Sequence, residues 1–194
     1  MSQENVERGD RIRLTGANQT RRRHRSLEQR ILVRFPALAR GVFYLGSRVP
    51  SGSRLRRWLL VRSMTLGMGA ANRRDFDALL LGLDPEIDYR VVSVGPAGGI
   101  APDLVGHHHG HAGYLYVWRA MLEGFADLTL EPEELLDLGD HLISVTRMEG
   151  HGSGSGVPVT RHLFQVFTLR RGLVVKQEDF GTRSEALEAV GLRE

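Results

Sequence analysis

Four histidines lie within five positions of this sequence, in the segment GHHHGHAGY at residues 106–114. Imidazole nitrogens are common zinc ligands, so this density raises the question of a metal site. On a strand, the alternating residues His107, His109 and His111 would share one face, whereas on a helix His107 and His111 would do so. Either arrangement could hold a metal ion.

The residues around the histidines argue against a metal site. Gly106 and Gly110 bracket the cluster, which places it on flexible backbone that does not hold ligand geometry. The nearest carboxylate, Asp103, lies outside the cluster and would at best orient a ligand. We therefore expect no bound metal.

The composition is typical of a globular chain without thiol chemistry. The 194 residues are 41% hydrophobic and 25% charged, and none is cysteine. The absence of cysteine excludes disulfides, thiolate nucleophiles and cysteine-based metal sites. The first residues are polar, unlike a signal peptide, and no apolar run approaches the ~20 residues that cross a bilayer. We therefore expect a cytoplasmic protein.

Positive charge is concentrated in the first third of the chain. Residues 1–63 carry fifteen arginines and four acidic residues, or 15 − 4 = +11, and the remainder carries 11 − 19 = −8. Such a basic segment could bind nucleic acid or an anionic membrane, or lie against the acidic body. Because no nucleic-acid-binding motif accompanies the run RRRHR at 21–25, we expect no nucleic acid as a partner, and we expect no membrane.

The basic segment also contains apolar residues, which favour packing on the body. We divide the chain into a basic N-terminal extension of residues 1–53, with residues 1–25 disordered, and a domain of residues 54–194. A free extension would leave its apolar side chains exposed. We therefore expect residues 26–53 to dock through Ile31, Leu32, Phe35, Leu38, Val42, Phe43 and Leu45.

Helices are predicted to dominate the first part of the domain. Trp58, Val61 and Met68 recur at helical spacing, and Asp84-Pro85 ends a helix because proline disfavours helical geometry in the residue before it. The predicted elements are a helix over 26–46 broken near Pro36, helices over 54–72 and 75–83, a strand over 87–94, a loop over 95–110 and a helix over 111–124.

The remaining third is predicted to be mostly β. The segments HLISVTRMEG, VTRHLFQVFTLR and GLVVKQEDF are separated by turns at 150–156 and 170–172, and LTLEPEELLDLGD leads into them. Consecutive strands joined by such turns form an antiparallel meander. Thr182 and Glu185 form a capping box for a closing helix. Helices followed by a sheet predict the α+β class.

The order and spacing of four segments closely resemble the SnoaL-like family, which belongs to the ketosteroid-isomerase-like, nuclear-transport-factor-2-like superfamily. The resemblance covers about residues 55–190. It implies a cone in which a strongly curved antiparallel sheet wraps around helices, with an apolar pocket at the wide end. Members commonly form homodimers through the outer sheet face. The segments are NRRDFDALLLGLDPEIDYR (72–90), GHAGYLYVWRAMLEGFADLTLEPEELLDLGD (110–140), HGSGSGVPV (151–159) and FTLRRGLVVKQEDF (167–180).

The resemblance does not extend to the catalytic residues of the ketosteroid isomerases. Those enzymes use a tyrosine on the first helix and a protonated aspartic acid to bind an enolate oxygen, and a second aspartate as the base. The corresponding positions here hold Gly67, Gln165 and Tyr89. The steroid-isomerase mechanism is therefore not supported.

The SnoaL-type cyclases carry an acid/base aspartate on the last strand, and the resemblance places this residue at Asp179. An apolar pocket raises the pKa of a carboxyl, which could then exchange a proton with a carbonyl compound. At a strand end before Gly181, the carboxylate could equally be a solvated or capping group. Strand parity puts Asp179 and Gln177 on one face. The residues that we expect to contact a ligand are Tyr89, Gln165, Trp118, Met68 and Phe167.

Two functional hypotheses remain. The first is a cyclase, isomerase or dehydratase that needs no cofactor and acts on a small apolar carbonyl compound through Asp179. The second is a non-catalytic ligand-binding or scaffolding homodimer. In the second hypothesis the basic segment makes the contacts. We expect a small apolar ligand as a partner.

Overall fold

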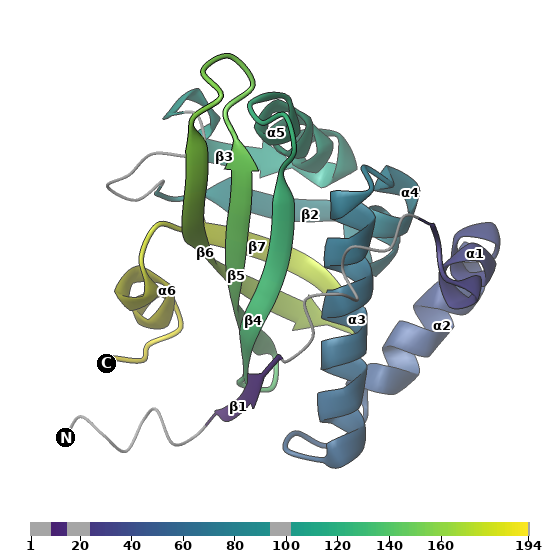
Figure 1. The fold of residues 1–194 in the computed structure, drawn as a ribbon. Helices are drawn as coiled ribbons and strands as arrows, with labels where there is room; N and C mark the ends of the chain where they lie inside the picture. Colours follow the sequence, from purple (N-terminus) through teal and green to yellow (C-terminus); the bar gives the residue numbers. More distant parts are fainter. Residues whose placement is uncertain (1–8, 15–23, 94–101, 194) are drawn as a thin grey trace.

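A strongly curved sheet organises the computed structural model, which describes residues 9–14, 24–93 and 102–193 (Figure 1). The strand order is β1-β4-β5-β6-β7-β2-β3, and helix α3 (Arg54–Asn72) lies on the concave side of the sheet. Helix α5 (Gly110–Glu123) packs against β2. The predicted α+β class and the curved sheet around N-terminal helices are confirmed.

Side-chain caps set the starts of the first helices. Ser26 forms a capping box with Gln29, Ser53 accepts from the amide of Arg56, and Asp75 accepts from the amide of Ala78. The predicted break near Pro36 is confirmed, because proline begins a new helix there. The elements are α1 (Leu27–Arg34), α2 (Pro36–Ser47), α3, α4 (Phe76–Leu79) and a 3-10 turn (Leu80–Gly82).

Strand β2 (Leu83–Val91) begins four residues earlier than the predicted start at 87, and the preceding helix is correspondingly shorter. Pro85 therefore lies inside a strand. The register between β2 and β7 shifts between Leu83 and Asp88, so the proline, which has no amide hydrogen, falls at an irregularity of the ladder.

Three of the four histidines lie on a strand and His111 lies in α5, so the predicted loop over 95–110 is wrong for its last residues. Strand β3 (Gly106–His109) pairs antiparallel with β2, with His108 opposite Tyr89. Glycine and histidine have little preference for strands, so this short edge strand is stabilised by its pairing with β2. Residue 94 of the predicted strand and residues 95–101 of the predicted loop lie outside the described residues.

The predicted antiparallel meander is confirmed. Its turns fall at the two predicted glycine-containing segments, between β5 and β6 and between β6 and β7. The sheet then continues from β7 to β2 by a parallel pairing, which the sequence did not predict. The four strands are β4 (Thr129–Asp137), β5 (His141–His151), β6 (Pro158–Arg170) and β7 (Leu173–Phe180).

The N-terminal segment contributes a strand to the sheet. Strand β1 (Asp10–Arg13) pairs antiparallel with β4, and Ile12 is buried against Leu135 and Phe167. The expected disorder of residues 1–25 is therefore wrong for residues 10–13. A four-residue strand with one apolar side chain carries too little pattern to be predicted. Residues 1–8 and 15–23 lie outside the described residues.

Apolar side chains pack on both faces of the sheet. The concave side buries Ile87, Val117 and Trp118. On the outer face, helix α6 (Arg183–Ala189), which begins with the predicted capping box, packs Leu187 on Val166. This helix covers part of the face that the resemblance assigns to homodimer contact.

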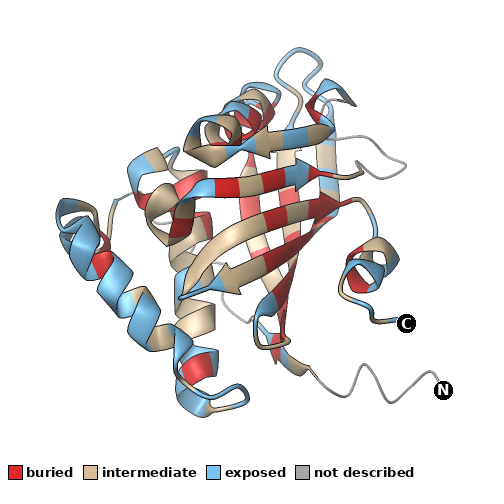
Figure 2. Ribbon diagram, turned by 180° about the vertical axis from the view of Figure 1, so that it is seen from behind, coloured by how far each residue is buried: buried red, intermediate tan, exposed pale blue. Residues whose placement is uncertain are grey.

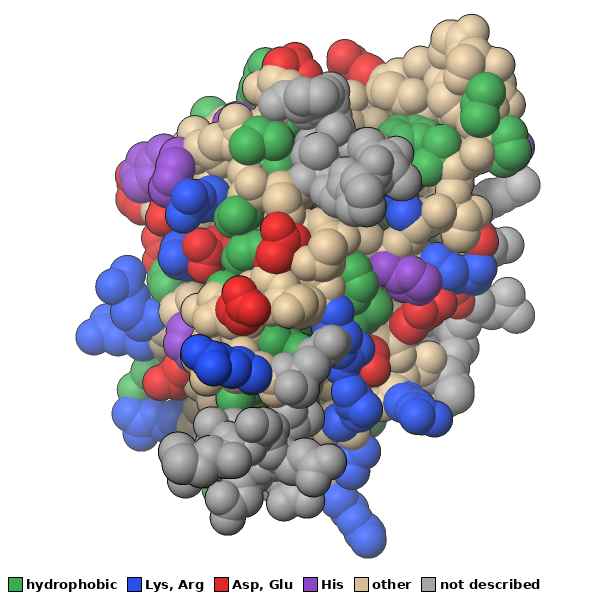
Figure 3. Space-filling view, turned by 90° about the vertical axis from the view of Figure 1, so that its left-hand side faces the viewer, with side chains coloured by type: hydrophobic (Ala, Val, Ile, Leu, Met, Phe, Trp, Pro, Cys, Tyr) green, Lys and Arg blue, Asp and Glu red, His purple; other side chains and the backbone are tan. Residues whose placement is uncertain are grey.

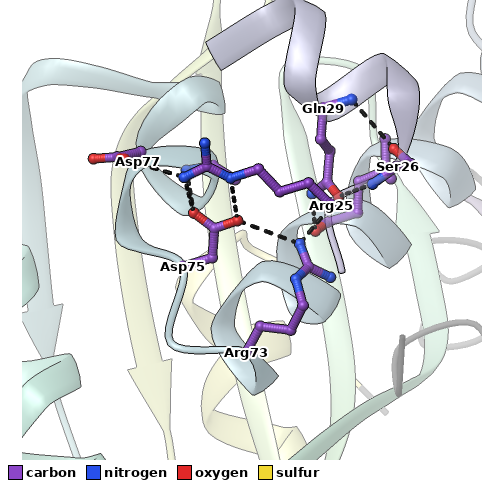
Figure 4. Close-up of polar contacts among 8 residues, drawn as sticks. Arg25, Ser26, Gln29, Arg73, Asp75 and Asp77 are labelled. Carbon is purple, nitrogen blue, oxygen red and sulfur yellow. Dashed lines mark hydrogen bonds and ion pairs between the residues drawn. The ribbon is translucent and has the colours of Figure 1, made fainter. Parts of the chain in front are cut away.

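Polar contacts fasten α1 and the two residues before it to the body (Figure 4). The guanidinium of Arg25 donates two hydrogen bonds to the carboxylate of Asp75, at 2.7 and 2.6 Å. The buried amide of Gln29 donates to the carbonyl of Leu66 in α3 and accepts from Arg73. The start of the extension's helices is thus tied to α3 and α4.

The apolar side chains of α1 and α2 are less buried than we expected. Exposed residues follow both helices (Figure 2), because only one side of each helix meets the body. Leu32 and Phe43 are partly buried as predicted. The expected docking is wrong for the other five, which are Ile31, Phe35, Leu38, Val42 and Leu45. None of the helices in the described segments is long and apolar enough for a bilayer crossing.

Candidate active site

A cavity of about 340 Å³ lies between helices α1 to α3 and the concave face of the sheet. This volume is in the range of small-molecule sites. Most of its wall is apolar, and two side-chain amides, one from β6 and one from β7, interrupt the apolar residues on the sheet side. Four of the predicted ligand contacts line it, namely Met68, Trp118, Gln165 and Phe167.

Asp179 is held by three hydrogen bonds at the inner end of this site. Pairing of β6 with β7 places Gln165 opposite Asp179, and Gln177 lies on the same face of β7. The amide Nε2 of Gln177 donates to Oδ1 of Asp179 at 2.9 Å, and that of Gln165 donates to the same oxygen at 3.3 Å. The hydroxyl of Tyr89 donates to Oδ2 at 2.7 Å. Asp179 is 1% exposed, which excludes the solvated role considered for it.

Burial controls the protonation of this group. It raises the pKa of Asp179 to about 6, although the hydrogen bonds from Tyr89, Gln177 and Gln165 stabilise the carboxylate and oppose the rise. Burial and the charge of Asp179 raise the pKa of the Tyr89 phenol well above its ordinary value, so the phenol remains a donor. A carboxyl that titrates near neutral pH suits general acid–base chemistry.

Asp179 and Tyr89 are not among the residues that line the cavity. The amides of Gln165 and Gln177, which do line it, link it to Asp179. Tyr114 also lines the cavity, with its ring centroid 4.9 Å from that of Tyr89. We did not predict Tyr114 as a site residue, although its position four residues before Trp118 puts both on one helix face.

The departure from the ketosteroid-isomerase pattern at residue 67 leaves open space. Gly67 lines the cavity, and a Cβ atom built on it would meet no other atom within 4 Å. The position that carries a tyrosine in those enzymes therefore adds room to the cavity.

The histidines do not converge on one point. His109 contacts the carboxylate of Glu86 at 3.3 Å, and His107 lies 3.6 Å from that of Asp88. His108 and His111 face the carbonyl oxygens of Leu104 and Leu83, respectively. Among the residues that the structure describes, no three histidine or carboxylate side chains form a group that could hold a metal ion.

Comparisons with known proteins agree with this architecture. Residues 67–177, more than half of the chain, match the model of the SnoaL-like domain family. No curated protein matches the chain.

Solved structures share the fold at low sequence identity. TerC, co-crystallised with polyporic acid, is 21% identical with a TM-score of 0.53, covering 63% of this chain and 90% of TerC. An NTF2-like protein from Burkholderia pseudomallei is 22% identical with a TM-score of 0.53, covering 67% and 95%. A protein of ketosteroid-isomerase-like fold from Catenulispora acidiphila, in complex with trimethylamine, is 15% identical with a TM-score of 0.51, covering 67% and 92%. The chain therefore belongs to the SnoaL-like family and has its NTF2-like fold.

Proposed function

We propose that this protein binds a small, mainly apolar carbonyl compound in the central cavity and rearranges it by proton transfer with Asp179, without a cofactor. The observation that carries the proposal is the buried Asp179 carboxyl, with a pKa of about 6, hydrogen-bonded to two amides of the cavity wall. Cyclisation and isomerisation of carbonyl compounds both require a group that takes a proton from carbon and returns it.

The polar groups of the wall define which ligand the cavity favours. Gln177 Oε1 is buried and has no hydrogen-bond donor among the described residues. An unsatisfied buried acceptor costs about 1–3 kcal/mol, and a hydroxyl or enol of the ligand would remove this cost. We therefore favour a hydroxylated or enolisable carbonyl compound over a hydrocarbon. The ligands of the fold relatives, polyporic acid and trimethylamine, differ from each other, so they do not select the substrate.

Ligand binding without turnover is the second candidate, and one observation favours it. Gln165 and Gln177 line the cavity and Asp179 does not, so a ligand in the cavity meets amides before it meets the carboxyl. Direct proton transfer requires contact within hydrogen-bond distance or through one water. One of the two amides must therefore move, or a water must bridge, for Asp179 to act. The non-catalytic form could be a homodimer.

Occupancy of the cavity is tested first, with the neutral dye Nile red as the probe. Gly67→Leu fills the open space on the wall and should weaken dye binding by on the order of tenfold or more. Gly41→Leu is the control, because Gly41 also lies in a helix with open space around it but does not line the cavity. Equal binding by both variants would place the dye elsewhere and remove the support for a cavity ligand.

Catalysis is tested on carbonyl compounds that displace the dye. Deuterium uptake from D₂O at the carbon next to the carbonyl, followed by NMR, reports proton transfer whatever the final product. Asp179→Asn should slow this exchange by on the order of 10²–10⁴. Displacement without exchange by the unmodified protein would favour the binding function, and undiminished exchange in the variant would exclude Asp179 as the base.

A further inference from the structure

An exposed apolar surface, here called the α1–α3 face, covers helices α1 and α2 and the first turns of α3. Several of its large side chains are more than half exposed, with Leu27 at 74%, Leu45 at 67% and Trp58 at 60%. Within α2, Leu38, Val42 and Leu45 are three or four residues apart and therefore share one side of the helix. The face consists of Leu27, Ile31, Phe35, Leu38, Val42, Leu45, Leu55 and Trp58.

The charges in residues 26–58, the segment that carries this face, are almost all positive. Residues 26–58 contain seven arginines and a single acid, Glu28, which is paired with Arg62 at 2.6 Å. Five of the arginines are exposed and form no ion pair with a carboxylate of the described residues. They are Arg30, Arg34, Arg40, Arg48 and Arg54. On the opposite side of the molecule, which carries α6, basic and acidic side chains are interspersed (Figure 3).

We propose that the α1–α3 face docks on the surface of an anionic lipid bilayer. Exposed leucine, phenylalanine and tryptophan side chains among arginines fit such a surface. The apolar side chains can insert among the acyl chains, and the arginines can pair with the headgroup phosphates. Tryptophan is favoured at this boundary. A symmetric contact between two copies of the face would instead place arginines against arginines.

The proposal concerns peripheral contact and requires no helix that crosses the bilayer. It revises our expectation of no membrane partner, because the apolar side chains that we expected to pack on the body are exposed. It also orients the cavity. Val42 and Trp58 line the cavity and are 44% and 60% exposed, so the cavity opens at the α1–α3 face. If the proposed function holds, an apolar ligand could pass between the bilayer and the cavity without crossing water; the docking itself does not depend on that function.

The apolar contribution is tested by flotation of the full chain with vesicles. We expect binding to vesicles that mix phosphatidylglycerol with phosphatidylcholine, and little binding to phosphatidylcholine alone. Leu38→Ser/Leu45→Ser should weaken binding by at least about a hundredfold, because binding no longer removes the apolar surface of two leucine side chains from water. The control Val105→Ser/Val157→Ser changes two apolar residues that are also exposed but lie outside the face, and it should bind like the unmodified protein.

The cationic contribution needs a charge-matched pair of variants. Arg34→Glu/Arg54→Glu should weaken binding to the anionic vesicles by at least about tenfold, because Arg34 lies over the ring of Phe35 and Arg54 is next to Leu55. Arg90→Glu/Arg193→Glu makes the same change in net charge at exposed positions outside the face and should leave most of the binding intact. Equal losses in the two variants would indicate attraction by net charge alone and would overturn the proposal.

Tryptophan fluorescence distinguishes docking through the α1–α3 face from binding through arginines elsewhere on the chain. The chain has two tryptophans, and Trp118 is buried, so the emission of Trp58 should shift to shorter wavelength on the anionic vesicles. Trp58→Phe should still bind and lose the shift. Binding without a shift, or binding unchanged in Leu38→Ser/Leu45→Ser, would overturn the proposal. So would sedimentation showing that this variant converts a dimer into a monomer, because the face would then be a subunit contact.

Discussion

The hydroxyl of Tyr89 donates a 2.7 Å hydrogen bond to Oδ2 of Asp179 and joins two parallel strands, β2 and β7, through their side chains. Both residues are buried, at 2% and 1% exposed. The bond favours the charged carboxylate and opposes the effect of burial on its pKa. The hydrogen bond from Tyr89 therefore keeps the pKa of Asp179 below the value that burial alone would give.

Removal of the phenol hydroxyl should raise the pKa of Asp179. Tyr89→Phe deletes one of the three hydrogen bonds to the carboxylate, so the pKa should move above its value of about 6. Carboxyl ¹³C NMR titration measures the change. Tyr114→Phe is the control, because Tyr114 lies beside Tyr89 and no hydrogen bond joins it to Asp179 in the described structure. An unchanged pKa in Tyr89→Phe would show that the bond does not stabilise the carboxylate.

The raised pKa of Asp179 predicts a stability that falls as pH rises. The folded protein releases this proton at about pH 6, whereas the ordinary value is 3.8, so the folded state binds more protons between these values. The stability contributed by the protonated group is complete below about pH 4 and is lost as pH rises through 6. The difference amounts to about 3 kcal/mol.

Asp179→Asn removes this dependence. In urea unfolding, the free energy of unfolding of the variant relative to the unmodified protein should increase by about 3 kcal/mol between pH 4 and pH 8. The exposed residue Asp103 provides the control, Asp103→Asn, which should change little across this range. Parallel pH profiles for Asp179→Asn and the unmodified protein would contradict the raised pKa.

Arg56 and Asp137 form a buried ion pair that fixes α3 to the end of β4. Two hydrogen bonds of 2.6 and 2.9 Å join them, and the residues are 7% and 3% exposed. Arg56→Leu leaves the carboxylate buried without its partner and should cost about 3–5 kcal/mol in urea unfolding. Arg56→Leu/Asp137→Leu should cost less than the single change. For Arg57→Leu, which breaks a half-exposed contact with Asp10, we expect a loss within about 1 kcal/mol.

Gly172 allows α2 to lie against the turn between β6 and β7. A Cβ atom at Gly172 would fall 2.0 Å from the carbonyl oxygen of Phe43, and its φ of +81° is strained for other residues. Gly172→Ala should therefore release α2 and speed amide hydrogen exchange along it. Gly191→Ala is the control that introduces only the backbone strain, because φ is +75° and no atom lies within 4 Å of the added Cβ atom. It should lower the free energy of unfolding by about 1–2 kcal/mol. Equal effects of the two changes would show that α2 moves aside freely.

Local signals explain which elements could be predicted from the sequence. The capping box of Thr182 and Glu185 could be predicted because it acts within three residues of its own position. Strands β1 and β3 could not, because each has four residues and exists through pairing with a distant strand. Helical periodicity likewise predicts that α2 has an apolar side, but it does not show whether that side packs on the body or is exposed.

The candidate site was predictable to the extent that it follows strand parity and family position. Gln165, Phe167, Met68 and Trp118 line the cavity as expected, and Asp179 is buried. The separation of Asp179 from the cavity by Gln165 and Gln177 depends on the side-chain conformations across two strands. Neither spacing nor resemblance contains that information.

The strand order has a consequence for synthesis on the ribosome. Strand β7 is last along the chain but lies between β6 and β2 in the sheet. Until it emerges, β2 lacks its partner on the side of β7, and the apolar residues of β2 can be exposed to aggregation. The carboxyl of Asp179 and the strand that completes the sheet then arrive together, so the candidate site is assembled in the same late step that closes the fold.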